Sequence, residues 1–396
     1  MQTDWAIVGG GIHGVHIALR LLEEGGVSRD RLRIVDPADR LLTRWHECTR
    51  VTGMQYLRSS SVHHLATDAY ALRRFAKSHR TRGAGQYAHP YDRPSLELFD
   101  DHCDQLIAKA RLEELHVRDR VEEAVVGVDG VTLRLNGGQE ITARRIVLAI
   151  GSSDEPHWPE WAPRDDARVH HVFQPEFDGW PAAHQESIAV VGGGVSAAQV
   201  ALRLSATGHR VFLVARHELR EKQFDVSAGW LGPKFMAGFQ RSPDHDHRRW
   251  IIDKARQSGT MPSDVRKALI RAVGKGTVEM LRTEVSDVAR REGGLALHLS
   301  DGSRAEVDHL LLATGFTSKR PGGALVDRLV ESASLPCAGC GYPVVDSLLR
   351  WHRRIHVSGP LAELELGPAS RNIAGARRAG ERIVQSVQRD LTTAAV

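Results

Sequence analysis

Residues 5–22 read WAIVGGGIHGVHIALRLL: a short apolar run, a glycine cluster, and a segment with helical periodicity. Gly9, Gly11 and Gly14 fit the pattern G-x-G-x-x-G, whose glycines allow a tight turn, close approach of a pyrophosphate, and close helix–strand packing. The free N–H groups and the dipole of the helix N-terminus favour phosphate there. The next apolar run ends at Asp36, where a carboxylate accepts hydrogen bonds from a ribose diol. The stretch therefore predicts a strand–turn–helix that binds a dinucleotide.

A second stretch of this kind, IAVVGGGVSAAQVALRL, occupies residues 188–204 and has the pattern G-x-G-x-x-A. The apolar run that follows it has Ala215 in the place of Asp36, and Arg216 comes next. A missing carboxylate beside an arginine suits a 2′-phosphate, so we expect this turn to prefer NADPH over NADH. Arg210 and Arg220 are further candidates for that contact.

The two halves of the chain share more than these turns. VTLRLNGGQEITARRIVLAIG (131–151) and LALHLSDGSRAEVDHLLLATG (295–315) align without a gap. Each contains an alternating strand, an Asn-Gly or Asp-Gly hairpin turn, a second strand, and a buried run that ends in Ala-x-Gly. The chain therefore contains two copies of one nucleotide-binding module, and the expected fold class is α/β with two Rossmann-like domains.

This arrangement resembles that of the two-dinucleotide-binding-domain flavoproteins, which include disulfide reductases and class B flavin monooxygenases. The resemblance implies that the first module holds FAD and that an inserted second module holds NADPH. It implies an FAD-binding domain of residues 1–155 and 306–396, and an NAD(P)H-binding domain of 156–305 with a helical or irregular insert at about 218–275. The C-terminal segment returns to the FAD-binding domain and lies against the flavin. Gly359-Pro360 stands there in place of the Gly-Asp of many members, so the chain departs from the pattern at that contact.

Within this superfamily the chain is similar to the class B monooxygenases that hydroxylate the nitrogen of amines such as ornithine and lysine. The similar segments are TGMQYLRSSSVHHL (52–65), GGGVSAAQ (192–199), the insert at 224–265, and LLLATGF (310–316). The resemblance implies that Gln55, Leu57 and Arg58 lie near the flavin, and it assigns no acid–base group. The residues expected to contact the two cofactors are Gly9, Gly11, Ile12, His13, Gly14, Asp36, Gln55, Arg58, Gly151, Gly192, Gly194, Val195, Ser196, Ala197, Arg216, Thr314, Gly315, Gly359 and Pro360.

The function that this similarity favours is an NADPH-dependent flavin monooxygenase, which oxygenates a nitrogen or sulfur of a small molecule with O₂ through a peroxyflavin. Two alternatives stay open. One is a flavin NAD(P)H oxidase or an electron-transfer or disulfide-type reductase on the same fold, for which Cys48 would be the candidate thiol. The other is a non-catalytic, nucleotide-sensing scaffold.

A possible zinc pattern lies near the C-terminus. Cys337, Cys340, His352 and His356 have the spacing C-x2-C-x11-H-x3-H, close to that of a zinc finger. However, RIHVSG, which contains the second histidine, has the pattern of the returning strand. Ligands four residues apart on a strand lie about 13 Å from one another. We therefore expect no metal.

Composition restricts the remaining possibilities. The chain has 396 residues, of which 41% are hydrophobic and 26% charged, with a net charge of +4 and four cysteines. The basic residues are spread along the chain, which argues against a nucleic-acid partner. No apolar run approaches the roughly 20 residues that cross a bilayer, and the N-terminal residues show no signal-peptide pattern. We expect a cytoplasmic protein, and a homo-oligomer is compatible with the sequence.

Overall fold

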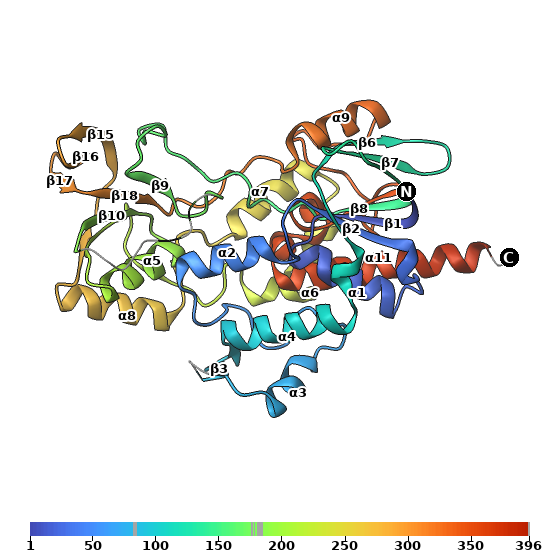
Figure 1. The fold of residues 1–396 in the computed structure, drawn as a ribbon, viewed down its shortest axis with the longest axis horizontal. Helices are drawn as coiled ribbons and strands as arrows, with labels where there is room; N and C mark the ends of the chain where they lie inside the picture. Colours follow the sequence, from blue (N-terminus) through green and yellow to red (C-terminus); the bar gives the residue numbers. More distant parts are fainter. Residues whose placement is uncertain (82–84, 176, 178, 180–184, 395–396) are drawn as a thin grey trace.

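The computed structural model describes residues 1–81, 85–175, 177, 179 and 185–394. Most of its strands belong to two separate sheets, each with a parallel core (Figure 1). In the first sheet the strand order is β19-β20-β8-β1-β2-β5. Pairing is parallel from β20 through β5, whereas β19 and β20 are antiparallel. The bounds are β1 (Gln2–Val8), β2 (Leu32–Asp36), β5 (His116–Arg118), β8 (Glu140–Leu148), β19 (Arg350–His352) and β20 (Ile355–Val357).

Helices and a hairpin cover the first sheet. Helix α1 (Ile12–Glu23) follows the first glycine turn and packs against the long C-terminal helix α11 (Ile373–Ala394). The hairpin of β6 (Val121–Val126) and β7 (Val131–Leu135) pairs antiparallel with β8, and α9 (Gly323–Ala333) packs on it. The buried surface of β1 is continuous from Trp5 to Val8, as expected of a parallel strand covered on both faces.

The second sheet is parallel throughout, with the order β14-β11-β10-β18-β9. Its strands are β9 (Val169–His171), β10 (Ser187–Val191), β11 (Arg210–Val214), β14 (Val278–Leu281) and β18 (His309–Leu312). Helix α5 (Val195–Ala206) follows the second glycine turn. A three-stranded antiparallel sheet adjoins it, formed by β15 (Val285–Arg291), β16 (Gly294–Leu299) and β17 (Arg304–Val307). The expected α/β class with two dinucleotide-binding folds is confirmed.

The expected boundary at residue 306 falls inside the second module. β17 pairs with β16, and β18 pairs with β10 and β9, so the chain leaves this module only after Leu312. The two connections between the modules then run side by side. His157 N donates to Gly315 O at 2.9 Å, and Thr317 N donates to Glu155 O at 3.0 Å. This pair of segments is called the crossover linkers below.

The insert at 218–275 is mainly helical, as expected from the sequence. It contains β12 (Arg220–Glu221), α6 (Pro233–Arg241), α7 (His245–Ala255), β13 (Thr260–Met261) and α8 (Ser263–Gly274). Helix α8 packs on α5 in the second module. Helices α6 and α7 lie instead between the two modules (Figure 1), where they share an apolar cluster with the C-terminal part of the chain. That cluster consists of Met236, Phe239, Ile252, Tyr342 and Leu364.

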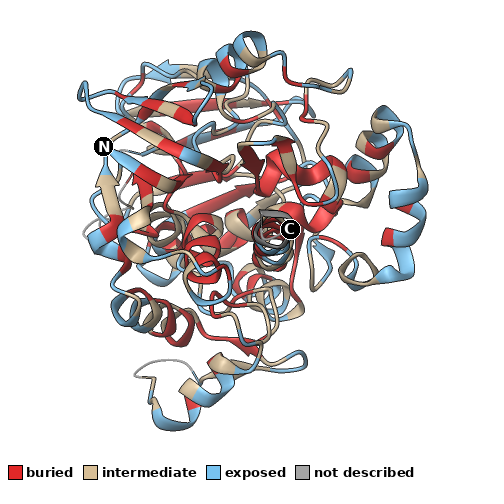
Figure 2. Cartoon of the chain, turned by 90° about the vertical axis from the view of Figure 1, so that its right-hand side faces the viewer, coloured by how far each residue is buried: buried red, intermediate tan, exposed pale blue. Residues whose placement is uncertain are grey.

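Shorter elements complete the fold. They are α2 (Thr43–Thr52), α3 (Ala71–Ser78), β3 (Tyr87–Ala88), β4 (Arg93–Pro94), α4 (Leu96–Lys109) and α10 (Glu363–Leu366). Buried residues gather in the central strands and in the helix faces that pack on them, whereas the outer hairpin and helix faces are exposed (Figure 2). Within the described part of the chain, no helix combines the length and apolarity that crossing a membrane requires.

Candidate functional site

The first glycine turn has a separate geometric reason for each glycine. Gly9 has φ +113°, and a Cβ there would lie 2.4 Å from the carbonyl oxygen of Ala149 at the end of β8. A Cβ on Gly14 would lie 1.8 Å from the carbonyl oxygen of Gly9, so α1 can approach the turn only without a side chain. At Gly11 nothing lies within 4 Å of such an atom. Gly9 and Gly14 are therefore needed by the fold, whereas Gly11 leaves a backbone cradle open to a ligand.

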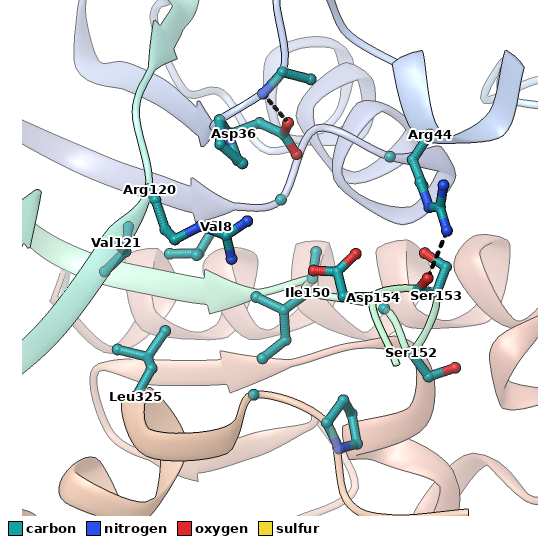
Figure 3. A pocket seen from close by; sticks show the side chains of 18 of the residues that line it. Val8, Asp36, Arg44, Arg120, Val121, Ile150, Ser152, Ser153, Asp154 and Leu325 are labelled. Carbon is teal, nitrogen blue, oxygen red and sulfur yellow. Dashed lines mark hydrogen bonds between the residues drawn. The ribbon is translucent and has the colours of Figure 1, made fainter. Parts of the chain in front are cut away.

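Asp36 stands at the end of β2 beside this cradle. Its Oδ2 accepts from Gly10 N at 2.7 Å, and its Oδ1 accepts from Ala38 N at 2.9 Å. Two backbone donors thus hold the carboxylate in one orientation, and Figure 3 draws one of the two hydrogen bonds. Each oxygen keeps a lone pair for a further hydrogen bond, which is what a ribose diol requires.

A cavity of about 600 Å³ opens at this edge of the first sheet, a size typical of cofactor pockets (Figure 3). Its walls come from the ends of β1, β2 and β8, from both crossover linkers, and from the start of α9. Arg44 of α2 points across its mouth and donates to Ser153 O at 2.8 Å. The expected site residues among its lining are Gly9, Gly11, Asp36 and Gly151.

His13, the second residue of α1, lies between the glycine turn and the C-terminal segment. Its Nδ1 is 2.7 Å from Ser358 Oγ, and its Nε2 is buried with no hydrogen-bond partner among the described residues. Burial lowers the pKa of His13 to about 4, against the smaller opposite effect of the nearby backbone of Arg371 and Asn372, so the ring is neutral near pH 7. When Ser358 donates to Nδ1, Nε2 carries the proton and is a donor without an acceptor. A buried donor of this kind costs free energy unless a ligand pairs with it, so the site fits a ligand that offers an acceptor.

Gly359 lies beside the His13 ring, and neither of these residues nor Pro360 lines the 600 Å³ cavity. Gly359 has φ +63°, and a Cβ there would lie 3.7 Å from the His13 ring. Gly359 and Pro360 are buried in the short helical turn that follows β20. Ile12 packs against the apolar core beneath α1.

Gln55, Leu57 and Arg58 do not line the 600 Å³ cavity. The Gln55 side chain is exposed, and Leu57 is buried. Arg58 bridges the two modules: its guanidinium donates to Gln223 O at 3.0 Å and Lys222 O at 2.8 Å in the insert. Burial lowers the pKa of Arg58. Arg58 therefore links the first module to the insert through hydrogen bonds. Its contact with a flavin stays a prediction.

The second glycine turn repeats the geometry of the first. Gly192 has φ +153°, and a Cβ there would lie 2.5 Å from Ala313 O at the end of β18. Gly194 caps α5, whose first residues include Val195, Ser196 and the buried Ala197. Thr314 Oγ1 donates to His157 O in the crossover linkers, beside Gly315.

The strand ends beside the two turns differ as the sequence predicts. Ala215 is buried in the position that Asp36 has in the first module. The side chain of Arg216 is 67% exposed and lies 3.8 Å from Glu284, so its guanidinium can reorient toward a ligand. Arg210 lies at the opposite end of β11, over the Phe212 ring, and is too far along the strand to serve this turn.

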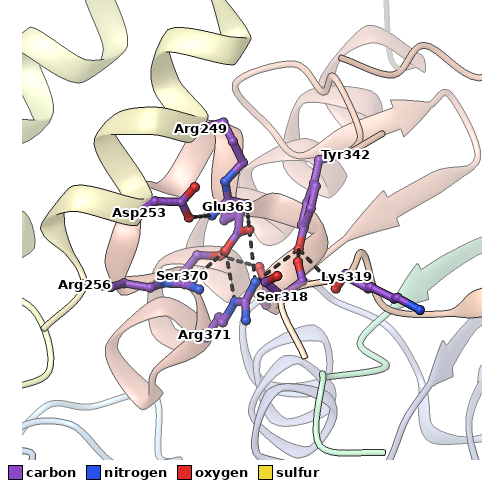
Figure 4. A network of polar contacts seen from close by, with 10 residues as sticks. Arg249, Asp253, Arg256, Ser318, Lys319, Tyr342, Glu363, Ser370 and Arg371 are labelled. Carbon is purple, nitrogen blue, oxygen red and sulfur yellow. Dashed lines mark hydrogen bonds and ion pairs between the residues drawn. The ribbon is translucent and has the colours of Figure 1, made fainter. Parts of the chain in front are cut away.

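A buried ionic cluster joins the modules, and no local sequence pattern indicated it. Glu363 of α10 is completely buried and forms ion pairs with Arg249, Arg256 and Arg371 (Figure 4). Burial alone would raise the pKa of Glu363, but the guanidiniums of Arg256, Arg371 and Arg249 hold it below its usual value. The segment GPLAELELGP shows only two glutamates, Glu363 and Glu365, among apolar residues, and this pattern does not reveal their arginine partners.

The cysteines do not form a dithiol site at the cavity. Cys48 of α2 is partly buried, and burial raises the pKa of its thiol, which disfavours the reactive thiolate. Cys337 is exposed, and Cys340 packs against the cluster of α6 and α7. His356 is buried against Trp5, with Nε2 3.1 Å from Ser386 Oγ. Over the residues that are placed, no three His, Cys, Asp or Glu side chains gather as a metal site.

Comparisons with known proteins agree with this architecture. A family model described as pyridine nucleotide-disulphide oxidoreductase matches residues 3–380. Among curated proteins, the indole-3-pyruvate monooxygenase YUCCA1 of Oryza sativa subsp. japonica is 25% identical over 224 residues, which are 51% of this chain and 54% of that protein. The aligned region thus spans about half the length of that relative.

Two solved structures show the same fold at low sequence identity. The cadaverine monooxygenase DfoA of Erwinia amylovora, bound to FAD, has a TM-score of 0.75 at 16% identity, covering 98% of this chain and 94% of that one. The bacillithiol disulfide reductase Bdr of Bacillus cereus has a TM-score of 0.62 at 16% identity, covering 98% of this chain and 100% of that one.

Proposed function

The chain belongs to the pyridine nucleotide-disulphide oxidoreductase family, and from this premise we propose that it is an FAD-dependent, NADPH-using monooxygenase of a small molecule. The observation that carries the proposal is the pair of glycine turns with unlike strand ends. The strand beside the first turn ends in a carboxylate held by two backbone N–H groups. The strand beside the second turn is followed by a buried alanine and an exposed arginine. Two different dinucleotides suit these two ends.

The residues assigned to FAD are those of the first module. The open backbone at Gly11 and the N-terminus of α1 would take the pyrophosphate, and Asp36 the ribose diol. The unpartnered Nε2 of His13 would donate to an acceptor of the same cofactor. When bound, FAD supplies the redox and oxygen chemistry, so the protein needs to bind, orient and exclude water.

The residues assigned to NADPH are those of the second module. The N-terminus of α5, with Gly194 and Ser196, would take the pyrophosphate, and Arg216 the 2′-phosphate. The domain assignment follows: the first sheet binds FAD, and the second sheet, from after residue 155 to Leu312, binds NADPH.

The properties of the thiols favour oxygenation over disulfide reduction as the activity of this protein. A reductase of this fold needs an accessible, low-pKa thiol at the flavin, whereas Cys48 is partly buried with a raised pKa. The names of YUCCA1 and DfoA, a monooxygenase of indole-3-pyruvate and one of cadaverine, support the same choice. The fold shared with the disulfide reductase Bdr keeps a reductase as the second candidate.

The test is to purify the protein with FAD and to follow reduction by NADPH or NADH without O₂, then reoxidation with O₂. Amines, thioethers and 2-oxo acids are screened for stimulated NADPH and O₂ consumption, with mass spectrometry of the product. A product that gains one oxygen atom supports the proposal. Release of one peroxide per NADPH with every compound would make the protein an oxidase, and NADPH-driven cleavage of low-molecular-weight disulfides would make it a reductase.

A further inference from the structure

Glu363 lies at the centre of a polar network that joins four chain segments from different parts of the fold, two of them through its own ion pairs (Figure 4). Arg249 lies on α7 and Arg256 directly follows it, and both come from the insert of the second module. Glu363 and Arg371 belong to the segment between β20 and α11 in the first module. The carboxylate therefore holds a helix of one module on the other.

The third and fourth segments enter through Tyr342. Its hydroxyl accepts from Arg371 Nη2 at 3.2 Å and lies 3.3 Å from the carbonyl oxygens of Ser318 and Lys319. Those two residues directly follow the crossover linker that leaves the second sheet, and Lys319 lines the 600 Å³ cavity. The Arg249 guanidinium also stacks over the Tyr342 ring, 4.9 Å from its centre. The insert and the linker thus converge on one polar network.

The network also adjoins His13 and Gly359, which lie next to the first glycine turn. The backbone of Arg371 and of the next residue lies against the His13 ring. Ser370, one residue earlier, donates its hydroxyl to Gly359 O. A shift of Arg371 would therefore reach His13 directly and Gly359 through Ser370.

The physical character of the cluster favours a role in geometry over a role in stability. Removing a carboxylate and several guanidiniums from water costs about as much as their attraction returns, so buried ion pairs add little net stability. Their better-attested use is to select one register between packed elements. Here the register selected is that of α7 on the C-terminal segment.

We propose that Glu363 is a positioning residue that orients the NADPH-binding module toward the flavin, although it belongs to neither glycine turn. Its carboxylate pairs at once with Arg249 and Arg256 of the insert and with Arg371, whose backbone lies beside His13. This inference rests on the proposed function, because it concerns the geometry of hydride transfer between the two cofactors. That transfer depends steeply on placement: an error of about 1 Å can cost roughly 100-fold in rate.

The test uses three variants of the FAD-loaded protein. E363Q keeps the shape of the side chain and removes its charge. R256Q removes one of the three guanidiniums and leaves Glu363 two partners. D166N is the matched control, because Asp166 is also a buried carboxylate with arginine partners, Arg168 and Arg290, but all three lie in the second module.

Two measurements are made on each variant. The first is the rate of flavin reduction by NADPH without O₂. It is compared with the rate of reduction by dithionite, which does not depend on the position of the NADPH-binding module. The second is hydrogen exchange in α7 and in residues 363–373. For E363Q and R256Q we expect NADPH reduction slower by roughly 10- to 100-fold, dithionite reduction unchanged, and faster exchange in both segments together. D166N should show neither effect, and R256K, which keeps the charge, should lie nearer to wild type than R256Q.

The proposal is overturned if E363Q or R256Q reduces at the wild-type rate while exchange in α7 is faster, or if exchange there does not change. If E363Q does not fold, because it leaves Arg256 and Arg371 without a carboxylate and Arg249 with Asp253 alone, R256Q decides by the same two criteria. If neither NADPH nor NADH reduces the wild-type flavin, the proposed function fails. The exchange measurement then decides separately whether Glu363 docks α7.

Discussion

At the scale of single residues, Gly11 and Gly14 make a matched pair within one turn. An added Cβ at Gly14 would lie 1.8 Å from a backbone oxygen, whereas at Gly11 it meets nothing within 4 Å. Gly11 also has an ordinary negative φ of −77° at the N-cap of α1. Substitution by alanine therefore tests the fold at Gly14 and ligand binding at Gly11.

We expect Gly11→Ala to fold with a free energy of unfolding, without FAD, within about 0.5 kcal/mol of wild type. Its affinity for FAD should fall at least roughly tenfold, because the methyl group occupies the space open to the pyrophosphate. Gly14→Ala should fail to give a stable protein. Denaturant unfolding and fluorescence titration with FAD check both variants. Unchanged FAD affinity in Gly11→Ala would show that the cradle does not hold the cofactor.

His102 allows a prediction about acid stability. It is buried, makes no hydrogen bond to any described residue, and packs on His64 and Phe75. Burial lowers its pKa to about 4. At a pH between the folded pKa and the unfolded pKa of about 6.5, His102 is protonated in the unfolded chain and neutral in the folded chain. Native stability is therefore lost as the pH falls through this window.

His102→Phe removes that proton uptake without breaking a hydrogen bond. Between pH 6.5 and 4, we expect the stability of the variant to fall less steeply with decreasing pH than that of wild type. The difference in slope should reach about 1.4 kcal/mol per pH unit. Urea unfolding at intervals of half a pH unit measures it. Parallel stability curves for the two proteins would mean that His102 is already protonated in the folded state.

At the scale of elements, the proposed choice of dinucleotide in each module rests on the ends of β2 and β11. The two strands hold equivalent places in their sheets, each paired with the strand that enters a glycine turn. Only β2 ends in a carboxylate, which is held by Gly10 N and Ala38 N. At the end of β11, Ala215 is buried and Arg216 is exposed. The proposed preference for NADPH therefore depends on the residues at the end of β11, which one substitution can test.

We expect Arg216→Ala to raise the KM for NADPH by roughly tenfold and to leave that for NADH unchanged, because it removes a charge-assisted contact with the 2′-phosphate. Thermal stability should not change, since an exposed pair such as Arg216 and Glu284 contributes little. Arg210→Ala, at the other end of β11, is the control and should alter neither constant. Steady-state oxidation of both coenzymes provides the measurement. Equal losses with NADPH and NADH would place the 2′-phosphate elsewhere.

The same scale explains where the sequence misplaced a domain boundary. The hairpin and final strand of the second module repeat the sequence pattern of residues 131–151. The assignment of residues from 306 to the first domain nevertheless cut through that repeat, since β17 and β18 pair within the second module. Strand pairing is a long-range property, so a boundary between two consecutive strands cannot be read from their local pattern.

At the scale of the whole molecule, the cavity proposed for FAD is assembled from distant parts of the chain. The cavity is lined by the glycine turn, by both crossover linkers and by the start of α9, which reach from Val8 to Leu325. A ligand that fills it must contact all of these segments at once. Binding is therefore coupled to the folding of the first module.

We expect removal of FAD to lower the melting temperature and added FAD to restore it in a concentration-dependent way. At a free FAD concentration 100 times the Kd, the gain in the free energy of unfolding is about 2.7 kcal/mol. Differential scanning fluorimetry of the deflavinated protein across a series of FAD concentrations measures this. NADPH alone should give a smaller shift. A melting temperature independent of FAD would contradict the assignment of the cavity.

The sequence by itself determined the fold class, the two glycine turns, the helical insert and the contrast between Asp36 and Arg216. These features are readable because each depends on a few neighbouring residues: glycine where a Cβ cannot fit, and a charge or its absence at a strand end. Only the tertiary structure decided that Arg58 ties the modules together and that Glu363 gathers three arginines. It also showed that His13 keeps a buried nitrogen without a partner. Those contacts join residues far apart in the chain, and their strength comes from burial, which no local pattern of residues specifies.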